Sequence, residues 1–101
     1  MFIINHRIWR LKFISPRHTL LEMPDGEFTV GVCDNNTQTI YLASHLRGYL
    51  LKKVLCHEIV HAMMFSYQVP LTYRQEEIVA GIIDTYGEKI INITDKILER
   101  L

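Results

Sequence analysis

Two histidines and a glutamate lie close together in the segment His57-Glu58-Ile59-Val60-His61. On a helix, residues four apart share one face, so both imidazoles can bind a single metal ion. Glu58 lies about 100° around the helix from His57 and can take a proton from water that the ion activates. This spacing is the HExxH motif. It predicts a Zn²⁺ site with His57 and His61 as ligands and Glu58 as the general base.

Such a site needs a third protein ligand and an open position for water. A metzincin pattern would have a histidine six residues after His61, where this sequence has Tyr67. The other common source is a glutamate on the next helix, and Glu76 and Glu77 both qualify. Helical phase places Glu76 on the apolar stripe, where a carboxylate is costly unless it is paired or bound to a cation. We therefore expect Glu76 to be the third ligand, with Glu77 as its main rival. A third interpretation makes Glu76 a helix-start carboxylate favoured by the helix dipole.

The elements that must position these residues form a strand-rich first part and a helical second part. β-rich runs separated by turn signals predict four short strands, at 8–14, 19–23, 28–33 and 39–42. Short turns favour antiparallel pairing. Apolar residues at helical spacing predict one helix ending near 66 and a second from 72 or 73, which Gly87 or residues 92–94 could break or bend. The predicted fold class is α+β, a small antiparallel sheet packed on two main helices.

Length and composition narrow the class of protein. A chain of 101 residues, 49% of them hydrophobic, predicts one folded domain over 1–101. Eleven basic residues balance eleven acidic ones, which argues against nucleic acid as a partner. No apolar run reaches the ~20 residues of a membrane span. Two isolated cysteines, Cys33 and Cys56, do not form a disulfide framework, so we expect a cytoplasmic protein.

Other features have two interpretations each. Tyr67 and Tyr73 flank the turn between the helices, where either could donate a hydrogen bond to an oxyanion or simply pack. The strand at 39–42 could be an edge that holds an extended peptide, or an interior strand. The many apolar residues at 90–101 could complete the core or form a partner surface. The sequence leaves the oligomeric state open.

Three segments together resemble a known family. The strand at 39–42, the segment 55–62 with its HExxH motif, and the segment 75–79 with its Glu-Glu pair are similar to the small zincin-like metallopeptidases of the ImmA/IrrE type. Short phage- and mobile-element-encoded members are the most similar. The resemblance covers about residues 38–91. Many members have a small acidic or amide residue shortly after the third ligand that supports a histidine, whereas this chain has Val79, Ala80 and Gly81. Support of the ligands is therefore undefined at this point.

The resemblance implies a minimal zincin-like fold and a cytoplasmic bacterial setting. It implies a gluzincin-like zinc site with His57, His61 and Glu76 as ligands and Glu58 as the general base. The expected function is a zinc-dependent metallo-endopeptidase that cleaves a protein or peptide substrate, in some members a regulator. The alternative is a metal-stabilised, non-catalytic interaction module. A DNA-associated protease is a third option, against which the neutral charge argues.

Overall fold

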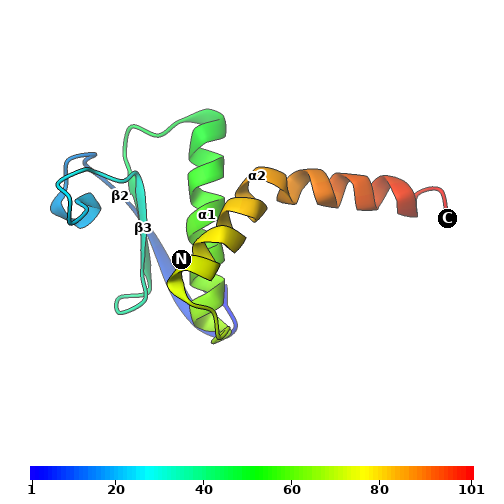
Figure 1. Cartoon of the computed structure of the whole chain (residues 1–101), viewed down its shortest axis with the longest axis horizontal. Helices are drawn as coiled ribbons and strands as arrows, with labels where there is room; N and C mark the ends of the chain where they lie inside the picture. The colour runs from blue at the N-terminus through cyan, green and yellow to red at the C-terminus, as the bar shows by residue number, and fades with distance from the viewer.

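The computed structural model describes residues 1–101 and contains a four-stranded sheet and two long helices (Figure 1). The strands are β1 (Phe2–Ile4), β2 (Arg7–Ile14), β3 (Gly31–Asp34) and β4 (Thr39–Ala43). The helices are α1 (Gly48–Ser66) and α2 (Tyr73–Leu98), and a short 3-10 helix, η1 (Thr19–Leu21), lies between β2 and β3. The predicted α+β class is confirmed.

The sheet is mixed, so the prediction of an antiparallel sheet is wrong in one pairing. The strand order is β1-β2-β4-β3. β1 pairs antiparallel with β2, and β3 with β4, whereas β2 and β4 run parallel. The short-turn argument holds for β3 and β4. It fails for β2 and β4 because a long segment joins β2 to β3, which lets the chain cross to the far edge before β4 returns to the middle. β4 is thus an interior strand, and β3 is an edge strand.

Other element predictions differ in detail. The run at 19–23 forms η1 rather than a strand, and β1 was not among the predicted strands. The second helix continues without a break through Gly87 to Leu98. A single glycine in a helix costs only about 1 kcal/mol relative to alanine, which the surrounding helix-forming residues can offset.

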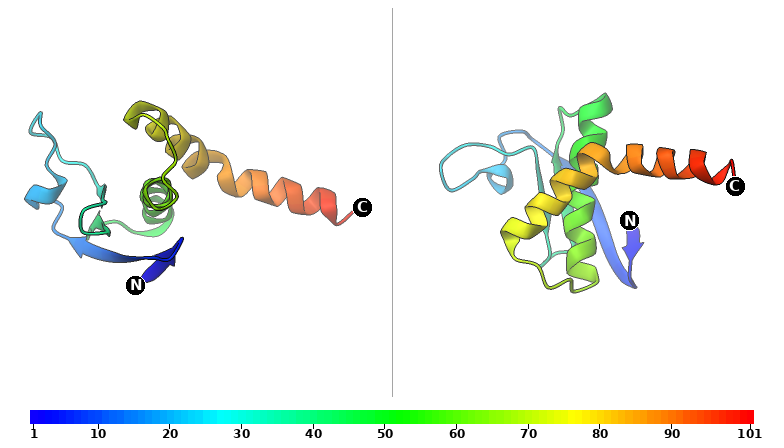
Figure 2. Two further views of the ribbon diagram at one scale, coloured as in Figure 1. Left: turned by 90° about the horizontal axis from the view of Figure 1, so that it is seen from below. Right: turned by 45° about the vertical axis from the view of Figure 1, so that its right-hand side comes forward.

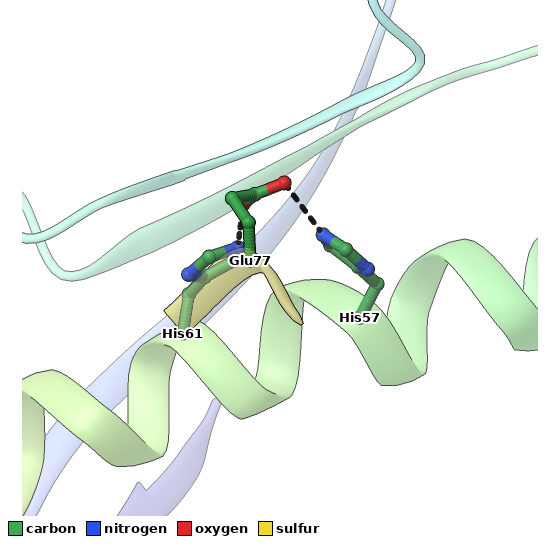
Figure 3. A group of neighbouring side chains, drawn as sticks. All are labelled: His57, His61 and Glu77. Atoms are coloured by element: carbon green, nitrogen blue, oxygen red, sulfur yellow. Dashed lines mark ion pairs between the residues drawn. The ribbon is translucent and has the colours of Figure 1, made fainter. Parts of the chain in front are cut away.

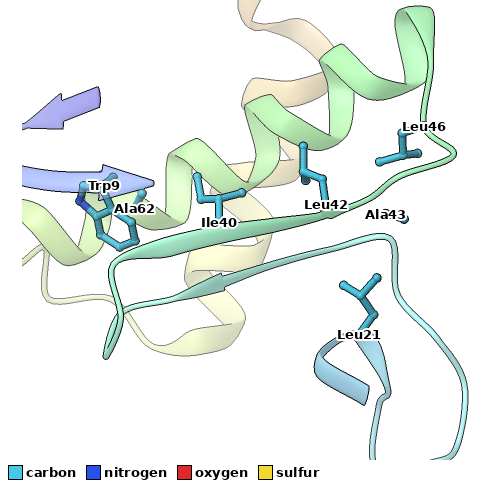
Figure 4. Packing of buried hydrophobic residues seen from close by; sticks show 7 residues of the cluster. All are labelled: Trp9, Leu21, Ile40, Leu42, Ala43, Leu46 and Ala62. Atoms are coloured by element: carbon cyan, nitrogen blue, oxygen red, sulfur yellow. The ribbon is translucent and has the colours of Figure 1, made fainter. Parts of the chain in front are cut away.

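The main core lies between the sheet and α1 (Figure 4). Trp9 from β2 and Ile40 and Leu42 from β4 are fully buried, and Ala62 of α1 belongs to the same cluster. The alternation along β2 points Arg10 and Lys12 outward, where they are exposed. This packing fixes α1, and with it the HExxH segment, against one face of the sheet.

Polar contacts hold the C-terminal end of α1 to the first hairpin. The Trp9 indole donates to Ser66 Oγ at 2.8 Å in a buried hydrogen bond. Asn5 Nδ2 donates to the Ser66 carbonyl at 3.0 Å, and Arg7 donates to the Phe65 carbonyl at 3.1 Å. These donors satisfy carbonyls that the last turn of a helix leaves without partners. The rotation of α1 about its axis is therefore fixed from both the core and its end.

The two halves of α2 have different surroundings. The first half crosses α1, and the second half projects away from the rest of the molecule (Figures 1 and 2). The overall dimensions are 51 × 29 × 27 Å, and a helix of 26 residues is itself about 39 Å long. No helix combines the length and the apolar character that crossing a membrane requires.

Candidate metal centre

The two histidines of the HExxH motif lie on successive turns of α1, and α2 brings a glutamate to them. The imidazole centroids of His57 and His61 are 5.1 Å apart. Glu77 lies between the two rings, with one carboxylate oxygen 2.5 Å from His61 Nε2 and the other 3.5 Å from His57 Nε2 (Figure 3). One ligand atom from each residue lies within 4.8 Å of the others. A single ion can therefore bind all three side chains.

A second carboxylate lies behind each histidine. Glu76 Oε1 is 2.6 Å from His61 Nδ1, and Asp84 Oδ2 is 2.7 Å from His57 Nδ1. An ionised carboxylate only accepts, so each Nδ1 carries the proton and donates it. In the neutral imidazole this leaves the Nε2 lone pair free on the side of Glu77. The two carboxylates thus fix the tautomer and orientation of both rings.

Asp84 is held in turn by neighbours on both helices. Lys53 Nζ lies 2.7 Å from Asp84 Oδ1, and the Thr85 hydroxyl donates to the same oxygen at 2.9 Å. Partial burial acts to raise the pKa of Asp84, but the hydrogen bonds from Lys53, His57 and Thr85 outweigh it and lower that pKa. Burial acts to lower the pKa of His57, and the hydrogen bond to Asp84 with the charges of Glu58 and Glu77 raises it. Asp84 thus forms an ion pair with Lys53 and accepts the hydrogen bond of His57.

Glu58 lies in the same cleft and is buried, with 7% of its surface exposed. Burial raises its pKa, while the neighbouring His61 and His57 act in the opposite direction. A close approach of β3 to α1 produces the burial: a Cβ on Gly31 would lie 3.2 Å from Glu58 Cγ and 2.9 Å from Val54 Cγ1. Glycine at position 31 therefore leaves room for the general-base candidate beneath the edge strand.

The cleft has a volume of about 420 Å³ and opens between β3, α1 and the start of α2. Cys33 lines it, and burial together with the charges of Glu58 and Glu76 raises the pKa of its thiol to about 12. Tyr73 also lines it and stacks on His61, with ring centroids 6.5 Å apart. Tyr67, the other tyrosine considered from the sequence, does not line the cleft and is exposed.

Local sequence fixes where α2 begins and so where its glutamates lie. Thr72 is the N-cap, and its hydroxyl accepts from Gln75 N at 3.2 Å. The Gln75 side chain accepts from Thr72 N at 2.9 Å, which completes a capping box. Glu76 and Glu77 follow directly, in the first turns of the helix. The cap thus sets the register of the carboxylates against α1.

The structure brings His57, Glu58 and His61 together as the motif predicts, but it exchanges the positions expected for the two glutamates. Glu77, not Glu76, faces the Nε2 atoms, and Glu76 contacts the opposite nitrogen of His61. Helical phase predicts Glu76 on the apolar stripe, and Glu76 is buried, with 8% of its surface exposed. A carboxylate can be buried by a hydrogen bond as well as by an ion. Burial alone therefore did not identify the group that points at the ligand position.

Sequence reasoning missed Asp84 as a supporting residue. The resemblance places the supporting residue directly after the glutamates, at 79–81, whereas Asp84 lies seven residues after Glu77. Seven residues are two helical turns, so Asp84 and Glu77 share a face of α2. Since His57 and His61 are one turn apart, the same helix face can serve both histidines. The seven-residue spacing of Glu77 and Asp84 is therefore the sequence feature that could have identified Asp84 as a partner of His57.

Comparisons of the chain with protein-family models, with curated proteins and with solved structures gave no match.

Proposed function

We propose that the chain is a zinc-dependent metallopeptidase with a zincin-like fold, in which His57, His61 and Glu77 bind the metal. The observation that carries the proposal is the convergence of these three ligand atoms within 4.8 Å of one another on the wall of a cleft. The relationship to the ImmA/IrrE-type enzymes is part of the proposal and rests on the motifs in residues 38–91. Glu77 replaces Glu76 as the proposed third ligand.

The donor set fits zinc. Two imidazole nitrogens and one carboxylate are a common ligand set of catalytic zinc sites, and histidine ligands usually donate their other nitrogen to a carboxylate. Both histidines have that partner, in Asp84 and Glu76. With the Nδ1 protons held there, the Nε2 lone pairs face the Glu77 oxygens. Acceptor groups that face one another favour a cation between them.

The residues around the ligands suit hydrolysis of an amide. Zinc with three protein ligands would keep one position open and supply Lewis-acid activation of water or of a carbonyl. Glu58 accepts the proton of the attacking water and returns it to the leaving amine, for which a pKa raised by burial is favourable. Burial and the nearby charges of Glu77, Glu58 and Glu76 raise the pKa of Tyr73, so its phenol keeps its proton and can donate to the carbonyl oxygen.

The shape of the cleft favours an extended peptide as substrate. β3 is an edge strand, and Gly31, Val32 and Cys33 from it line the cleft opposite the HExxH helix. An edge strand has backbone groups free to pair with an added strand. We therefore propose β3, and not the strand at 39–42, as the edge that holds an extended peptide. Cys33 and Cys56 are free thiols, which suits the reducing cytoplasm in which we place the protein.

Metal analysis is the direct test of the site. Protein purified without chelator is expected to contain one zinc ion per chain, measured by elemental mass spectrometry. Metal-depleted protein should take up zinc again and become more stable to heat, because a ligand that binds only the folded state stabilises it. A chain without zinc that takes up none on reconstitution would sink the proposal.

Glu58→Gln tests catalysis separately from metal binding. The variant should retain zinc but lose peptide hydrolysis by a factor of about 10²–10⁴, the usual contribution of a general base. Cleavage is measured by mass spectrometry on a library of peptides from denatured proteins. Glu88→Gln is the matched control, since Glu88 is exposed on α2 and pairs with Lys52. Equal hydrolysis by Glu58→Gln and the wild-type chain would contradict the assigned role.

The exposed apolar residues in the second half of α2 favour one alternative, a metal-stabilised interaction module without catalysis. Glu58→Gln distinguishes the two functions. In a module the substitution would leave both zinc content and biological activity unchanged, whereas a peptidase would keep the zinc and lose the activity.

A further inference from the structure

The cleft of the proposed metal centre continues past His61 into a part with apolar walls. We call Met23, Phe65 and Leu71 the apolar pocket, since all three line the cleft. Phe65 lies four residues after His61 on α1, so both side chains point to the same side of the helix. Phe65 and Leu71 are half-buried, and Met23 is 44% exposed. The apolar pocket therefore begins one helical turn from a proposed metal ligand.

The walls of the apolar pocket come from three segments that the fold already holds. Phe65 belongs to α1 and packs against the main core. Leu71 lies in the turn before α2, where its N–H donates to the Val69 carbonyl at 2.9 Å. Met23 follows η1, and its N–H donates to the Glu27 carbonyl at 2.7 Å. A pocket that is formed before the ligand arrives needs less ordering when a side chain enters it.

The charges in the cleft favour an uncharged side chain in the apolar pocket. No lysine or arginine lines the cleft, so an acidic side chain would find no cation outside the metal centre. The carboxylates that line it are Glu58, Glu76 and Glu77, which all belong to the metal centre. Glu76 is already bonded to His61 Nδ1, so a buried basic side chain would find no free carboxylate on the walls of the pocket. A buried charge without a partner is costly, whereas an apolar side chain gains from leaving water.

The edge strand β3 offers backbone groups to a peptide that lies along the cleft. In an antiparallel pair, residues alternate between those bonded to the partner strand and those whose N–H and C=O point away from it. Ala43 N donates to the Val30 carbonyl at 2.9 Å, directly before β3 begins. The alternation then turns the backbone groups of Gly31 and Cys33 to the open side. Both residues line the cleft, so a peptide paired with them lies beside the metal centre.

A peptide bonded to Gly31 and Cys33 would pass the metal centre and then the apolar pocket. Gly31 lies against the general-base candidate, since a Cβ on it would be 3.2 Å from Glu58 Cγ. Cys33 lies about 6.8 Å further along β3, close to the rise of about 6 Å along α1 from His61 to Phe65. Side chains of an extended peptide point to the same side at every second residue. A peptide whose scissile bond lies at the metal centre therefore presents to the apolar pocket a side chain within two residues of that bond.

We infer that the apolar pocket sets the substrate specificity of this site: the substrate is an extended peptide segment with a bulky apolar side chain within two residues of the bond that is cleaved. The inference rests on the proposed peptidase function and adds the class of peptide. Leucine, isoleucine, methionine and phenylalanine are the side chains that gain most from burial in such a pocket. Burial of one of them corresponds to a gain in affinity of about 10-fold.

The positions of cleavage in a peptide library test the inference. Zinc-loaded protein, with the cut sites mapped by mass spectrometry, should favour a bulky apolar residue at one fixed position within two residues of the cleaved bond. Met23→Glu and Leu71→Glu each bring a carboxylate into the apolar pocket, and each should shift that preference to lysine or arginine. Leu20→Glu and Val69→Glu are the matched controls, because these exposed residues lie close by in sequence and do not line the cleft. The controls should leave the preference unchanged, and circular dichroism should be equal in all the variants.

Peptide binding separates this inference from the proposed catalysis. Fluorescence anisotropy measures how zinc-loaded Glu58→Gln protein binds short serine-glycine peptides that differ only in a central leucine, lysine or aspartate. The leucine peptide should bind about 10-fold more tightly than the other two. Cleavage without a preferred residue, or a preference that Met23→Glu and Leu71→Glu both leave unchanged, overturns the inference and leaves the peptidase proposal standing. Protein that binds zinc but cleaves nothing contradicts the peptidase proposal instead, and equal binding of the three peptides then overturns the role of the apolar pocket as well.

Discussion

The first half of α2 buries carboxylates, whereas the second half of the same helix exposes isoleucines. Glu76 is buried and the Asp84 side chain is only 8% exposed, yet Ile90 and Ile97 are more than half exposed. What faces the helix accounts for this difference. Imidazoles and a lysine of α1 face the carboxylates, and no part of the chain faces the isoleucines. Along α2, whether a side chain is buried depends on which groups lie opposite it and not on whether it is polar or apolar.

The comparison suggests what each half binds. Three carboxylates around two histidines form a cluster that a cation would complete, because buried acidic groups need compensating charge. An apolar helix face in water is completed by another apolar surface. The same helix thus carries the proposed metal ligand near one end and an exposed apolar face near the other.

The largest expected loss of zinc affinity comes from changing Glu77, the proposed metal ligand, and not from changing the carboxylates that contact the Nδ1 atoms. Glu77→Gln removes the charge that faces both Nε2 atoms, so we expect zinc affinity to fall by more than about 100-fold, beyond the usual effect of supporting residues. Competition with a chromophoric chelator measures the affinity. Glu88→Gln is the control on the same helix. Zinc binding as tight in Glu77→Gln as in the wild type would remove Glu77 from the site.

The next effect compares the core with the exposed apolar residues in the second half of α2. Leu42→Ala should cost about 2–5 kcal/mol of unfolding free energy, because the fully buried side chain leaves a cavity between β4 and α1. Ile97→Ala should change the stability of the dilute monomer by less than about 0.5 kcal/mol. Urea unfolding at low and at high protein concentration measures both. An equal cost for the two substitutions in the dilute monomer would mean that the second half of α2 packs on its own chain.

Smaller effects are expected from the carboxylates that orient the imidazoles. Glu76→Gln and Asp84→Asn should each weaken zinc binding by about 10–100-fold, the usual cost of losing a partner on the second nitrogen of a ligand histidine. The mechanism is loss of ring orientation and tautomer, since the Nε2 atoms and Glu77 stay in place. Zinc titration again measures the effect. A loss in Glu76→Gln larger than that in Glu77→Gln would return the ligand role to Glu76.

Local patterns predicted the part of the site that lies on one helix. The four-residue spacing of His57 and His61 is a property of α1 alone, so it could be inferred without knowing the rest of the fold. The choice between Glu76 and Glu77 depends on how α2 crosses α1, to within a fraction of a helical turn. That crossing depends on contacts between residues distant in sequence, such as Lys53 of α1 with Asp84 of α2. The sequence therefore narrowed the third position to two residues and favoured Glu76, whereas in the structure Glu77 faces the Nε2 atoms.

The fold shows the same limit. The α+β class, the two helices and the hairpin of β3 and β4 follow from short-range patterns and were predicted, whereas β1 and its hairpin with β2 were not. The parallel pairing of β2 with β4 is a long-range contact. It depends on how the long segment containing η1, which joins β2 to β3, crosses to the far edge of the sheet. The apolar residues at 90–101 have two interpretations in the sequence, completion of the core or a partner surface, and the structure leaves them exposed. Apolar spacing along a helix is the same whether the surface meets the core or a second molecule.

The smallest effect compares two threonines at opposite ends of α2. Thr72→Ala removes the N-cap oxygen that accepts from Gln75 N, and such a loss typically costs about 1 kcal/mol. Thr94 bonds only the Ile90 carbonyl one turn back, on an exposed surface. Thr94→Ala should therefore be close to neutral in the monomer, because alanine has the higher helix propensity. Thermal unfolding of the two variants measures this difference.

Zinc affinity of the two threonine variants tests whether the Thr72 cap also positions the glutamates. Fraying of the first turn in Thr72→Ala would release the register of Glu76 and Glu77, so zinc binding should weaken along with stability. Thr94→Ala should leave zinc affinity unchanged because its turn has no contact with α1. If both variants bound zinc as tightly as the wild type while Thr72→Ala alone lost stability, the cap would stabilise the helix without positioning the glutamates. The register against the histidines would then depend on the contacts that Glu76 and Asp84 make with α1, about one turn and three turns further along the helix.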